Sequence, residues 1–151
     1  MKSDKSIRNI CIAAIKRATI APYDFSLTSF FEEELWDRFD NDVVNVRNVA
    51  EGELPVSMVV IDADNYTLIT TRQIITCQNG SIALAKPNDI ISWQWNDFKG
   101  YIDRSYTCGR LTLTDNQIFE VFIETGRASM AMIYAIRTLV GQYHKSKSYQ
   151  N

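Results

Sequence analysis

The chain has 151 residues, of which 46% are hydrophobic, and its formal net charge is −2. This length fits one domain that buries roughly two-thirds of its unfolded surface. Because it has only 6 Gly and 3 Pro and no low-complexity tract, a disordered chain is excluded. No apolar run approaches the length of a membrane span, and the basic N-terminus has no apolar signal region. We therefore expect a cytoplasmic protein.

The three cysteines give no sign of a disulfide framework or of a metal site. Cys11, Cys77 and Cys108 are an odd number at wide and irregular spacing. Disulfide-stapled domains and zinc sites both need closer and regular spacing. We expect buried, reduced thiols and neither a metal nor a cofactor.

Charge is unevenly distributed along the chain. Residues 1–20 carry a net charge of +4, residues 21–64 carry −9, and residues 65–151 carry +3. A segment at −9 repels phosphate groups, which argues against nucleic acid and anionic membranes as its partner. If this segment has a partner, we expect a basic protein.

The first residues show the apolar spacing of a helix. Ser3 or Asp4 can cap it, and Pro22 closes it or follows it closely. The apolar positions recur three and four residues apart, at Ile7, Ile10, Cys11, Ala14, Ile15 and Ala18.

A second helix is predicted from Thr28 or Ser29. Ser29 is followed three residues later by Glu32, which is the spacing of a capping box. On this helix three acidic residues fall on one side, namely Glu33, Asp37 and Asp40. Residues 1–42 are thus predicted to form a helical hairpin that packs on the rest of the domain.

From residue 43 the pattern changes to short β-strands. We expect strands over residues 44–49, 54–61, 66–69, 73–78, 81–85, 91–95, 110–114 and 117–123. Asn79-Gly80 is the strongest hairpin signal, and residues 96–108 are predicted to be a long loop or a poorly ordered hairpin tip. Trp93 and Trp95 share a register with Ile91, which predicts core side chains. An amphipathic helix over 126–144 ends the domain, and 146–151 are predicted to be a disordered tail.

Three segments carry a resemblance to a known family. They are Leu-Ile-Thr-Thr-Arg-Gln-Ile-Ile at 68–75, a short strand after Gly at 80–85, and Asp-Ile-Ile-Ser-Trp at 89–93. Over about residues 53–144 the chain resembles bacterial pleckstrin-homology-like (PH-like) domains. The resemblance implies an α+β, mainly β fold, in which about seven antiparallel strands form a strongly bent sheet or partly open barrel with a C-terminal capping helix. Residues 43–145 would form this unit, and 1–42 would be an addition.

Such domains bind phosphoinositides, peptides or other proteins. The lipid-binding members resemble one another in a basic loop between the first two strands, whereas the corresponding loop here, at 62–65, contains Asp62 and Asp64 and no Lys or Arg. Two carboxylates repel a phosphate headgroup, so lipid binding is disfavoured. Arg72 and Lys86 lie near other turns and are candidates for a weaker anion contact.

Catalysis finds little support in the residues. His144 is the single histidine and falls near the end of the last helix, so no Ser-His-Asp or Cys-His arrangement is indicated. Asp62 and Asp64 have the spacing of a metal-binding Asp-x-Asp pair, but a turn explains them better. We therefore predict a protein-interaction module that is not an enzyme, with Glu33, Asp37, Asp40, Asp62 and Asp64 as partner-binding candidates.

Two alternatives remain open. The first is an inhibitor or immunity-type protein that uses Glu33, Asp37 and Asp40 to block a basic partner. The second is a ligand-pocket protein or small enzyme with a cystatin-like or nuclear-transport-factor-like (NTF2-like) cone. Such cones usually end on a strand, whereas this chain is predicted to end on a helix.

Overall fold

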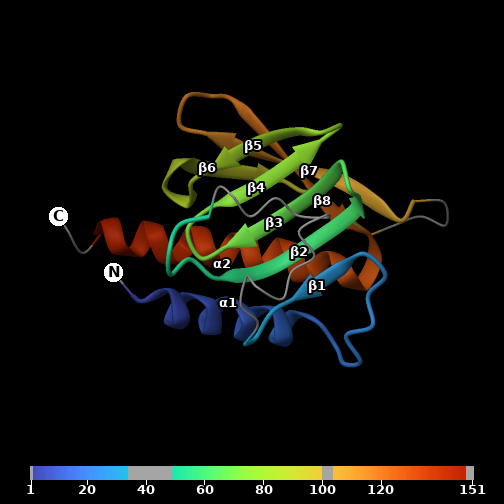
Figure 1. Ribbon diagram of the computed structural model, residues 1–151, viewed down its shortest axis with the longest axis horizontal. Helices are drawn as coiled ribbons and strands as arrows, with labels where there is room; N and C mark the ends of the chain where they lie inside the picture. The colour runs from blue at the N-terminus through green and yellow to red at the C-terminus, as the bar shows by residue number, and fades with distance from the viewer. Residues whose placement is uncertain (1, 34–48, 100–103, 149–151) are drawn as a thin grey trace.

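The computed structural model describes residues 2–33, 49–99 and 104–148. These residues form an α+β fold that is mainly β, as the sequence predicts (Figure 1). In chain order the elements are α1 (Asp4–Ala18), β1 (Thr28–Phe30), β2 (Pro55–Asp62), β3 (Asn65–Thr70), β4 (Ile74–Gln78), β5 (Ser81–Ala85), the 3-10 helix η3 (Pro87–Asp89), β6 (Ile90–Gln94), β7 (Tyr106–Leu113), β8 (Ile118–Glu124), the 3-10 helix η4 (Gly126–Ala128) and α2 (Ser129–Ser148).

The strands form two antiparallel sheets. Sheet A has the order β1-β2-β3-β4-β5, and sheet B has the order β6-β7-β8. Within each sheet the strands follow one another as in a meander, so every neighbour is also the next strand in the chain. As far as the described residues extend, the two sheets do not join into a closed barrel.

The main core lies between the two sheets and the two helices. The helices α1 and α2 lie side by side and both contact β2 (Figure 1). The largest side chains that this core buries completely include Ile15, Ile69, Ile123, Met132 and Ile136. Sheet A therefore turns one face toward the helices and sheet B, and its other face away from them.

A buried threonine joins the two sheets. The hydroxyl of Thr67 in β3 accepts a hydrogen bond from the backbone N–H of Phe122 in β8 at 2.8 Å, and it shares a second hydrogen bond with Thr76 Oγ1 at 2.9 Å. Thr67 is fully buried. An unpaired N–H at this depth costs more than a hydrogen bond usually gains, so this contact fixes how sheet B crosses sheet A.

The N-terminal region confirms the first helix and contradicts the start of the second. Ser3 caps α1 through the N–H of Ser6, and the helix ends at Ala18. Thr28 to Phe30, however, form the edge strand β1, paired with β2. The physical reason is Glu124, whose carboxylate accepts hydrogen bonds from the backbone N–H groups of Ser26 and Leu27 and from Thr28 Oγ1. Because these donors are already bound to Glu124, they stabilise the extended backbone here and not the first turn of a helix. The rest of the predicted second helix, 34–42, and the strand predicted over 44–48 lie outside the described residues.

Three further predictions need correction. β7 begins at Tyr106, inside the region that the sequence predicts to be a loop, because it pairs with β8 along its whole length. Ile91 is 54% exposed, since a register shift between Ile90 and Ser92 places Ile90 in the core instead. The last helix continues to Ser148, through 146–148 of the predicted tail. Residues 149–151 lie outside the described part of the chain.

Candidate functional site: the outer face and free edge of sheet A

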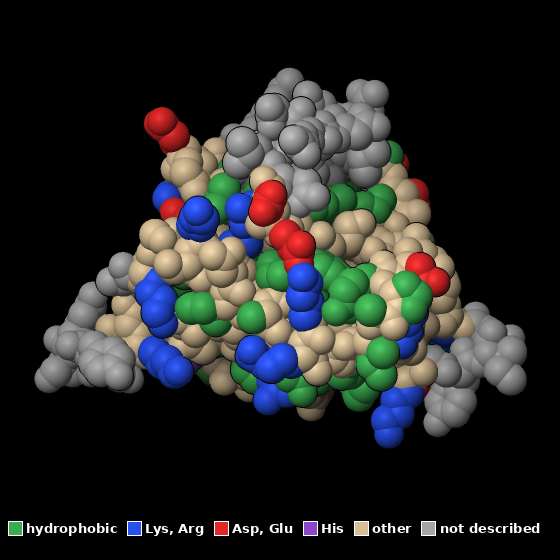
Figure 2. All heavy atoms as spheres, turned by 90° about the horizontal axis from the view of Figure 1, so that it is seen from below, with side chains coloured by type: hydrophobic (Ala, Val, Ile, Leu, Met, Phe, Trp, Pro, Cys, Tyr) green, Lys and Arg blue, Asp and Glu red, His purple; other side chains and the backbone are tan. Residues whose placement is uncertain are grey.

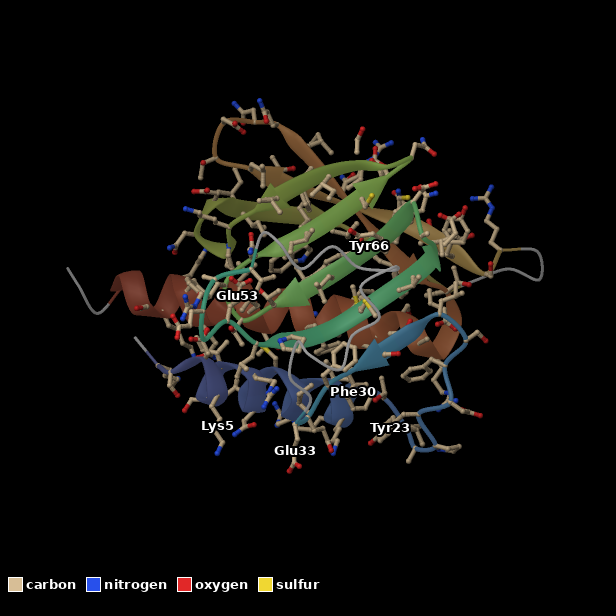
Figure 3. The ribbon with its side chains drawn as sticks, viewed as in Figure 1. Lys5, Tyr23, Phe30, Glu33, Glu53 and Tyr66 are labelled. Carbon is tan, nitrogen blue, oxygen red and sulfur yellow. The ribbon has the colours of Figure 1, made fainter. Side chains whose placement is uncertain are left out.

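The face of sheet A that points away from the helices is apolar, and we call it the outer face. Two cross-strand rows of side chains run over it from β2 to β5. One row is Val60, Tyr66, Cys77 and Ile82, and the other is Met58, Leu68, Ile75 and Leu84. Figure 3 shows Tyr66 on this face.

The exposure of these rows rises toward β5. In β3 and β4 the four side chains are at most 4% exposed, and Val49 packs beside them. In β5, Ile82 is 39% and Leu84 is 47% exposed. Isolated apolar side chains are common on protein surfaces and need no explanation. Ile82 and Leu84 are different because they extend a contiguous apolar face to the edge of the sheet.

The edge of β5 is also open along its backbone. Within the described residues β5 pairs only with β4. The connecting turn, Asn79-Gly80, has φ values of 50° and 84°, the signature of a two-residue type I′ hairpin. In such a hairpin the pair that closes the turn, Gln78 and Ser81, is hydrogen-bonded, and bonded and non-bonded pairs then alternate. It follows that the amide and carbonyl groups of Ile82 and Leu84 point away from β4, toward the free side.

The residues of β5 itself carry none of the usual protection against strand pairing. Proteins guard exposed edges with charged side chains, Pro or bulges. β5 has the sequence Ser-Ile-Ala-Leu-Ala, carries no charge, and pairs with β4 without a register shift. The first charged residue is Lys86, directly after the strand, and Pro87 opens η3.

The two predicted acidic candidates, Asp62 and Asp64, lie at the turn between β2 and β3. Asp62 Oδ1 accepts hydrogen bonds from the Asp64 N–H at 2.8 Å and from Asn65 Nδ2 at 3.0 Å, so its role includes shaping the turn. The Asp64 side chain is exposed and lies beside the neighbouring hairpin, since its Oδ1 is 3.8 Å from the position of a Cβ on Gly80. Asp64 thus stands at one end of β5 and Lys86 at the other.

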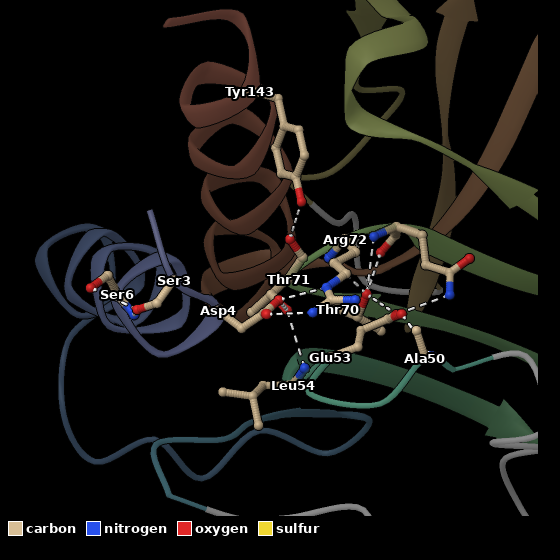
Figure 4. A network of polar contacts seen from close by, with 11 residues as sticks. Ser3, Asp4, Ser6, Ala50, Glu53, Leu54, Thr70, Thr71, Arg72 and Tyr143 are labelled. Carbon is tan, nitrogen blue, oxygen red and sulfur yellow. Dashed lines mark hydrogen bonds and ion pairs between the residues drawn. The ribbon is translucent and has the colours of Figure 1, made fainter. Parts of the chain in front are cut away.

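Arg72, the other predicted anion contact, is bound within the molecule (Figure 4). Its Nε donates to Asp4 Oδ1 at 3.0 Å and its Nη2 donates to Asp4 Oδ2 at 2.7 Å. These hydrogen bonds lower the pKa of the Asp4 carboxyl and raise the pKa of Arg72. An incoming anion would meet this carboxylate, which already neutralises the guanidinium. The sequence gives no hint of the pairing, because the partners are 68 residues apart.

Further hydrogen bonds extend this contact to α2 and to the loop before β2 (Figure 4). Tyr143 donates its hydroxyl to the Thr71 carbonyl at 2.7 Å. The buried Glu53 carboxylate accepts from Thr70 Oγ1, from Gln73 Nε2 and from the Ala50 N–H. The network ties α1, α2 and the turn between β3 and β4 together, and its members are already engaged with one another.

Glu33, the first of the predicted acidic partner residues, borders a surface hollow of about 500 Å³ next to α1. The hollow is lined by Lys5, Arg8, Asn9, Glu32, Glu33 and Leu54. Glu32 also forms an ion pair with Lys16. Figure 2 shows this side of the molecule, where Lys and Arg side chains are spread among a few acidic ones, and Figure 3 places Lys5 near Glu33. The acidic residues of this hollow therefore lie among basic ones. Asp37 and Asp40 lie outside the described residues.

A second hollow, of about 290 Å³, is aromatic and lies beside β1. It is lined by Tyr23, Phe25, Thr28, Ser29 and Phe30. Tyr23 meets Phe30 edge to face at 5.1 Å between ring centroids, and Figure 3 shows both at this end of the molecule. Arg127 lies over the Phe25 ring at 5.2 Å and donates to Asp24 at 2.8 Å. These contacts hold the loop between α1 and β1 on η4, directly before α2.

The groups that could serve catalysis are dispersed. Cys11 is completely buried, and burial raises its pKa to about 12, so it is not an activated nucleophile. Cys77 is buried and Cys108 is half-buried, which corrects the expectation of three buried thiols. The indoles of Trp93 and Trp95 are half-buried and stacked at 5.9 Å. Among the described residues, no three His, Cys, Asp or Glu side chains gather as they would around a metal ion.

No helix in the described ranges combines the length and the apolar character that crossing a membrane requires. Comparison with protein-family models, with curated proteins and with solved structures finds nothing that matches this chain.

The residues that mark this site, Ile82 and Leu84, are not among the sequence-based candidates. A signal was present, because Ser81 to Ala85 is an uncharged strand that follows a tight turn. Periodicity alone does not show that β5 ends the sheet. The edge becomes evident only in the structure, where η3 separates β5 from β6 and β6 belongs to the second sheet.

Proposed function

We propose that this chain is a noncatalytic protein-interaction module, and that it binds an extended protein segment as an added strand at the free edge of β5. The observation that carries the proposal is the coincidence at Ile82 and Leu84 of exposed apolar side chains and outward backbone groups. Strand addition uses both, because main-chain hydrogen bonds supply affinity and alternate side chains supply specificity.

We further propose that β2–β8 and α2 form a PH-like unit. The support is the number and order of elements, seven antiparallel strands followed by a C-terminal helix. On this view α1 and β1 are additions, with α1 packed against α2 and β1 against β2. PH-like domains include peptide and protein binders, which agrees with the proposed mode of binding.

The acidic-face inhibitor and the lipid-binding alternatives have weaker support. Glu32 is paired with Lys16, and Arg72 is held by Asp4, so each surface has lost part of the charge that its alternative needs. For a small ligand, the hollow beside β1 offers mainly the rings of Tyr23, Phe25 and Phe30, of which Tyr23 and Phe30 already contact each other edge to face.

The test is affinity capture from a lysate of the source organism with three baits: the wild-type protein, Ile82→Lys/Leu84→Lys, and the control Ile20→Lys. Ile20 is 73% exposed and follows α1 in the chain, and α1 lies on the side of the molecule away from β5 (Figure 1). We expect a stoichiometric protein that the wild type and the control retain and the β5 variant loses. We also expect the amides of Ile82 and Leu84 to exchange more slowly in the complex.

A partner that the β5 variant retains would overturn the proposed surface. Capture of anionic lipid without a protein would favour the membrane alternative instead. The dependence on salt distinguishes strand addition from the acidic-face alternative. The affinity of a complex that Glu33 forms with a basic partner falls steeply as ionic strength rises, whereas the affinity of an apolar strand interface changes little.

A further inference from the structure

We propose that the strand added at β5 is the β5 strand of a second copy of this chain. The inference rests on the proposed function and specifies its partner. The two copies would pair antiparallel about a twofold axis at Ala83, which joins their sheets A edge to edge.

The alternation along β5 between residues bonded to β4 and residues whose backbone groups are free allows this register. An antiparallel pair centred on Ala83 sets Ile82 opposite Leu84 of the second copy. Both residues direct their amide and carbonyl groups to the free side, so they form a hydrogen-bonded pair. The twofold axis repeats it, and the backbone groups left open on Ile82 and Leu84 are all satisfied.

The side chains also match. Ile82 and Leu84 lie on the outer face, so in the pair each Ile82 side chain lies beside a Leu84 side chain of the second copy on that same face. The two apolar rows of one copy would then continue into those of the other. Burial of these side chains, now 39% and 47% exposed, supplies the hydrophobic part of the binding energy.

The charges at the ends of β5 are complementary in this register and favour a second copy. Lys86 has φ −90° and ψ 140°, so the extended backbone continues through it. In this register Ala85, the last residue of β5, lies opposite Ser81 of the second copy, so Lys86 reaches the end of that copy where the Asn79-Gly80 turn lies. The Asp64 carboxylate is at this same end, 3.8 Å from the position of a Cβ on Gly80. The pairing therefore brings each Lys86 to the end of β5 that carries Asp64 of the second copy, and the symmetry does so twice.

Pairing of this kind closes on itself. After the two β5 edges meet, the other edge of sheet A among the described residues is β1, a strand of three residues. Short edge strands are poor templates for further pairing. An uncharged edge that would otherwise promote open-ended aggregation is thereby covered in a defined dimer.

The experiment measures mass in solution by sedimentation and by light scattering, from low micromolar to several hundred micromolar full-length protein. We expect a reversible dimer for the wild type and for the control Ile20→Lys, and a monomer for Leu84→Lys. Lys86→Glu and Asp64→Lys should each weaken the dimer by about tenfold, because each places like charges together. The double variant Lys86→Glu/Asp64→Lys should restore it, since it exchanges the two charges.

The outcomes separate the inference from the proposed function. A wild type that stays monomeric throughout overturns the dimer, and so does a dimer that Leu84→Lys leaves intact or one that the charge exchange does not restore. If the monomer still captures another protein through Ile82 and Leu84, the proposed function stands and only the identity of the partner is wrong. Lys86 and Asp64 are both exposed, so their variants keep the test decisive even if Leu84→Lys impairs folding.

Discussion

The guanidinium of Arg72 donates two parallel hydrogen bonds to the carboxylate of Asp4, and this contact joins the turn between β3 and β4 to the first turn of α1. Thr71 Oγ1 donates a third hydrogen bond to the same carboxylate. Asp4 thus serves both its own helix, as an acidic residue at the positive end of the dipole, and the docking of that helix on the sheet.

This arrangement predicts how stability depends on pH. The Asp4 pKa is lowered in the folded protein from an ordinary value of 3.8, chiefly by the hydrogen bond from Arg72. Its contribution is fully present above the unfolded pKa and is lost as pH falls through the lower, folded pKa. Because the Arg72 side chain is 42% exposed, we expect Asp4→Asn to lower the free energy of unfolding by about 1 kcal/mol or less at neutral pH.

Urea denaturation of wild type and Asp4→Asn from neutral pH down to acid checks this prediction. The difference between the two proteins should be constant at neutral pH, shrink below about pH 4 and vanish in stronger acid. A difference that grows toward acid would contradict it. The matched control is Asp24→Asn, which removes the partner of Arg127 in an exposed loop and leaves the contact between α1 and the turn unchanged.

The hydroxyl of Thr67 gives a second prediction, because it is the acceptor for the buried N–H of Phe122. Thr67→Val keeps the shape of the side chain but leaves that N–H without a partner, which should cost about 2 kcal/mol of stability. Thr76→Val removes only the hydrogen bond between the two hydroxyls and should cost about 1 kcal/mol or less. Chemical denaturation of the two variants measures both losses of unfolding free energy. Equal losses would show that the hydrogen bond to Phe122 contributes little to stability.

How far the sequence predicts this fold depends on whether the deciding contact is local. The hairpin at Asn79-Gly80 was predicted correctly because its positive φ values are a local property of those two residues. β1 was missed because its deciding partner, Glu124, lies about a hundred residues away. Ile91 was assigned to the wrong side because a single register shift between Ile90 and Ser92 reverses every later side chain.

The candidate site follows the same rule. The sequence identifies charged residues readily, and Asp64 and Lys86 were among its candidates. It does not show that Lys16 neutralises Glu32 or that Asp4 occupies Arg72, since both pairings arise from packing between separate elements. Nor does it show that β5 is an edge. A site made of apolar side chains and backbone groups carries no residue type that distinguishes it from core.

The cysteines predict a graded reaction with thiol reagents. Burial raises the pKa of Cys11 to about 12 and also raises the pKa of the half-buried Cys108. In the native protein at mildly alkaline pH we expect Cys108 to react slowly, and Cys11 and Cys77 to stay unmodified, because the thiolate is the reactive form and only Cys108 has part of its side chain in solvent. Mass spectrometry of the labelled peptides measures this, with denatured protein as the control in which all three react. Early labelling of Cys11 would show that α1 detaches from α2.

The two glycines Gly109 and Gly141 predict opposite effects of the same substitution. A Cβ on Gly109 in β7 would lie 2.8 Å from Ile123 Cδ1 and 3.0 Å from the Trp95 ring, both packed in or against the core. Since such crowding forces neighbours out of their positions, Gly109→Ala should cost about 1 to 3 kcal/mol. Gly141 lies inside α2 with nothing within 4 Å of the new atom, so Gly141→Ala should stabilise the protein by about 0.5 to 1 kcal/mol.

Thermal and urea unfolding of the two variants measure the contrast directly. The midpoint should fall for Gly109→Ala and rise for Gly141→Ala relative to the wild type. Tryptophan fluorescence adds an independent reading, because only the substitution at Gly109 displaces Trp95 and with it the stacked Trp93. A neutral effect at Gly109 with an unchanged spectrum would mean that β7 does not approach Trp95 as closely as the packing of sheet B requires.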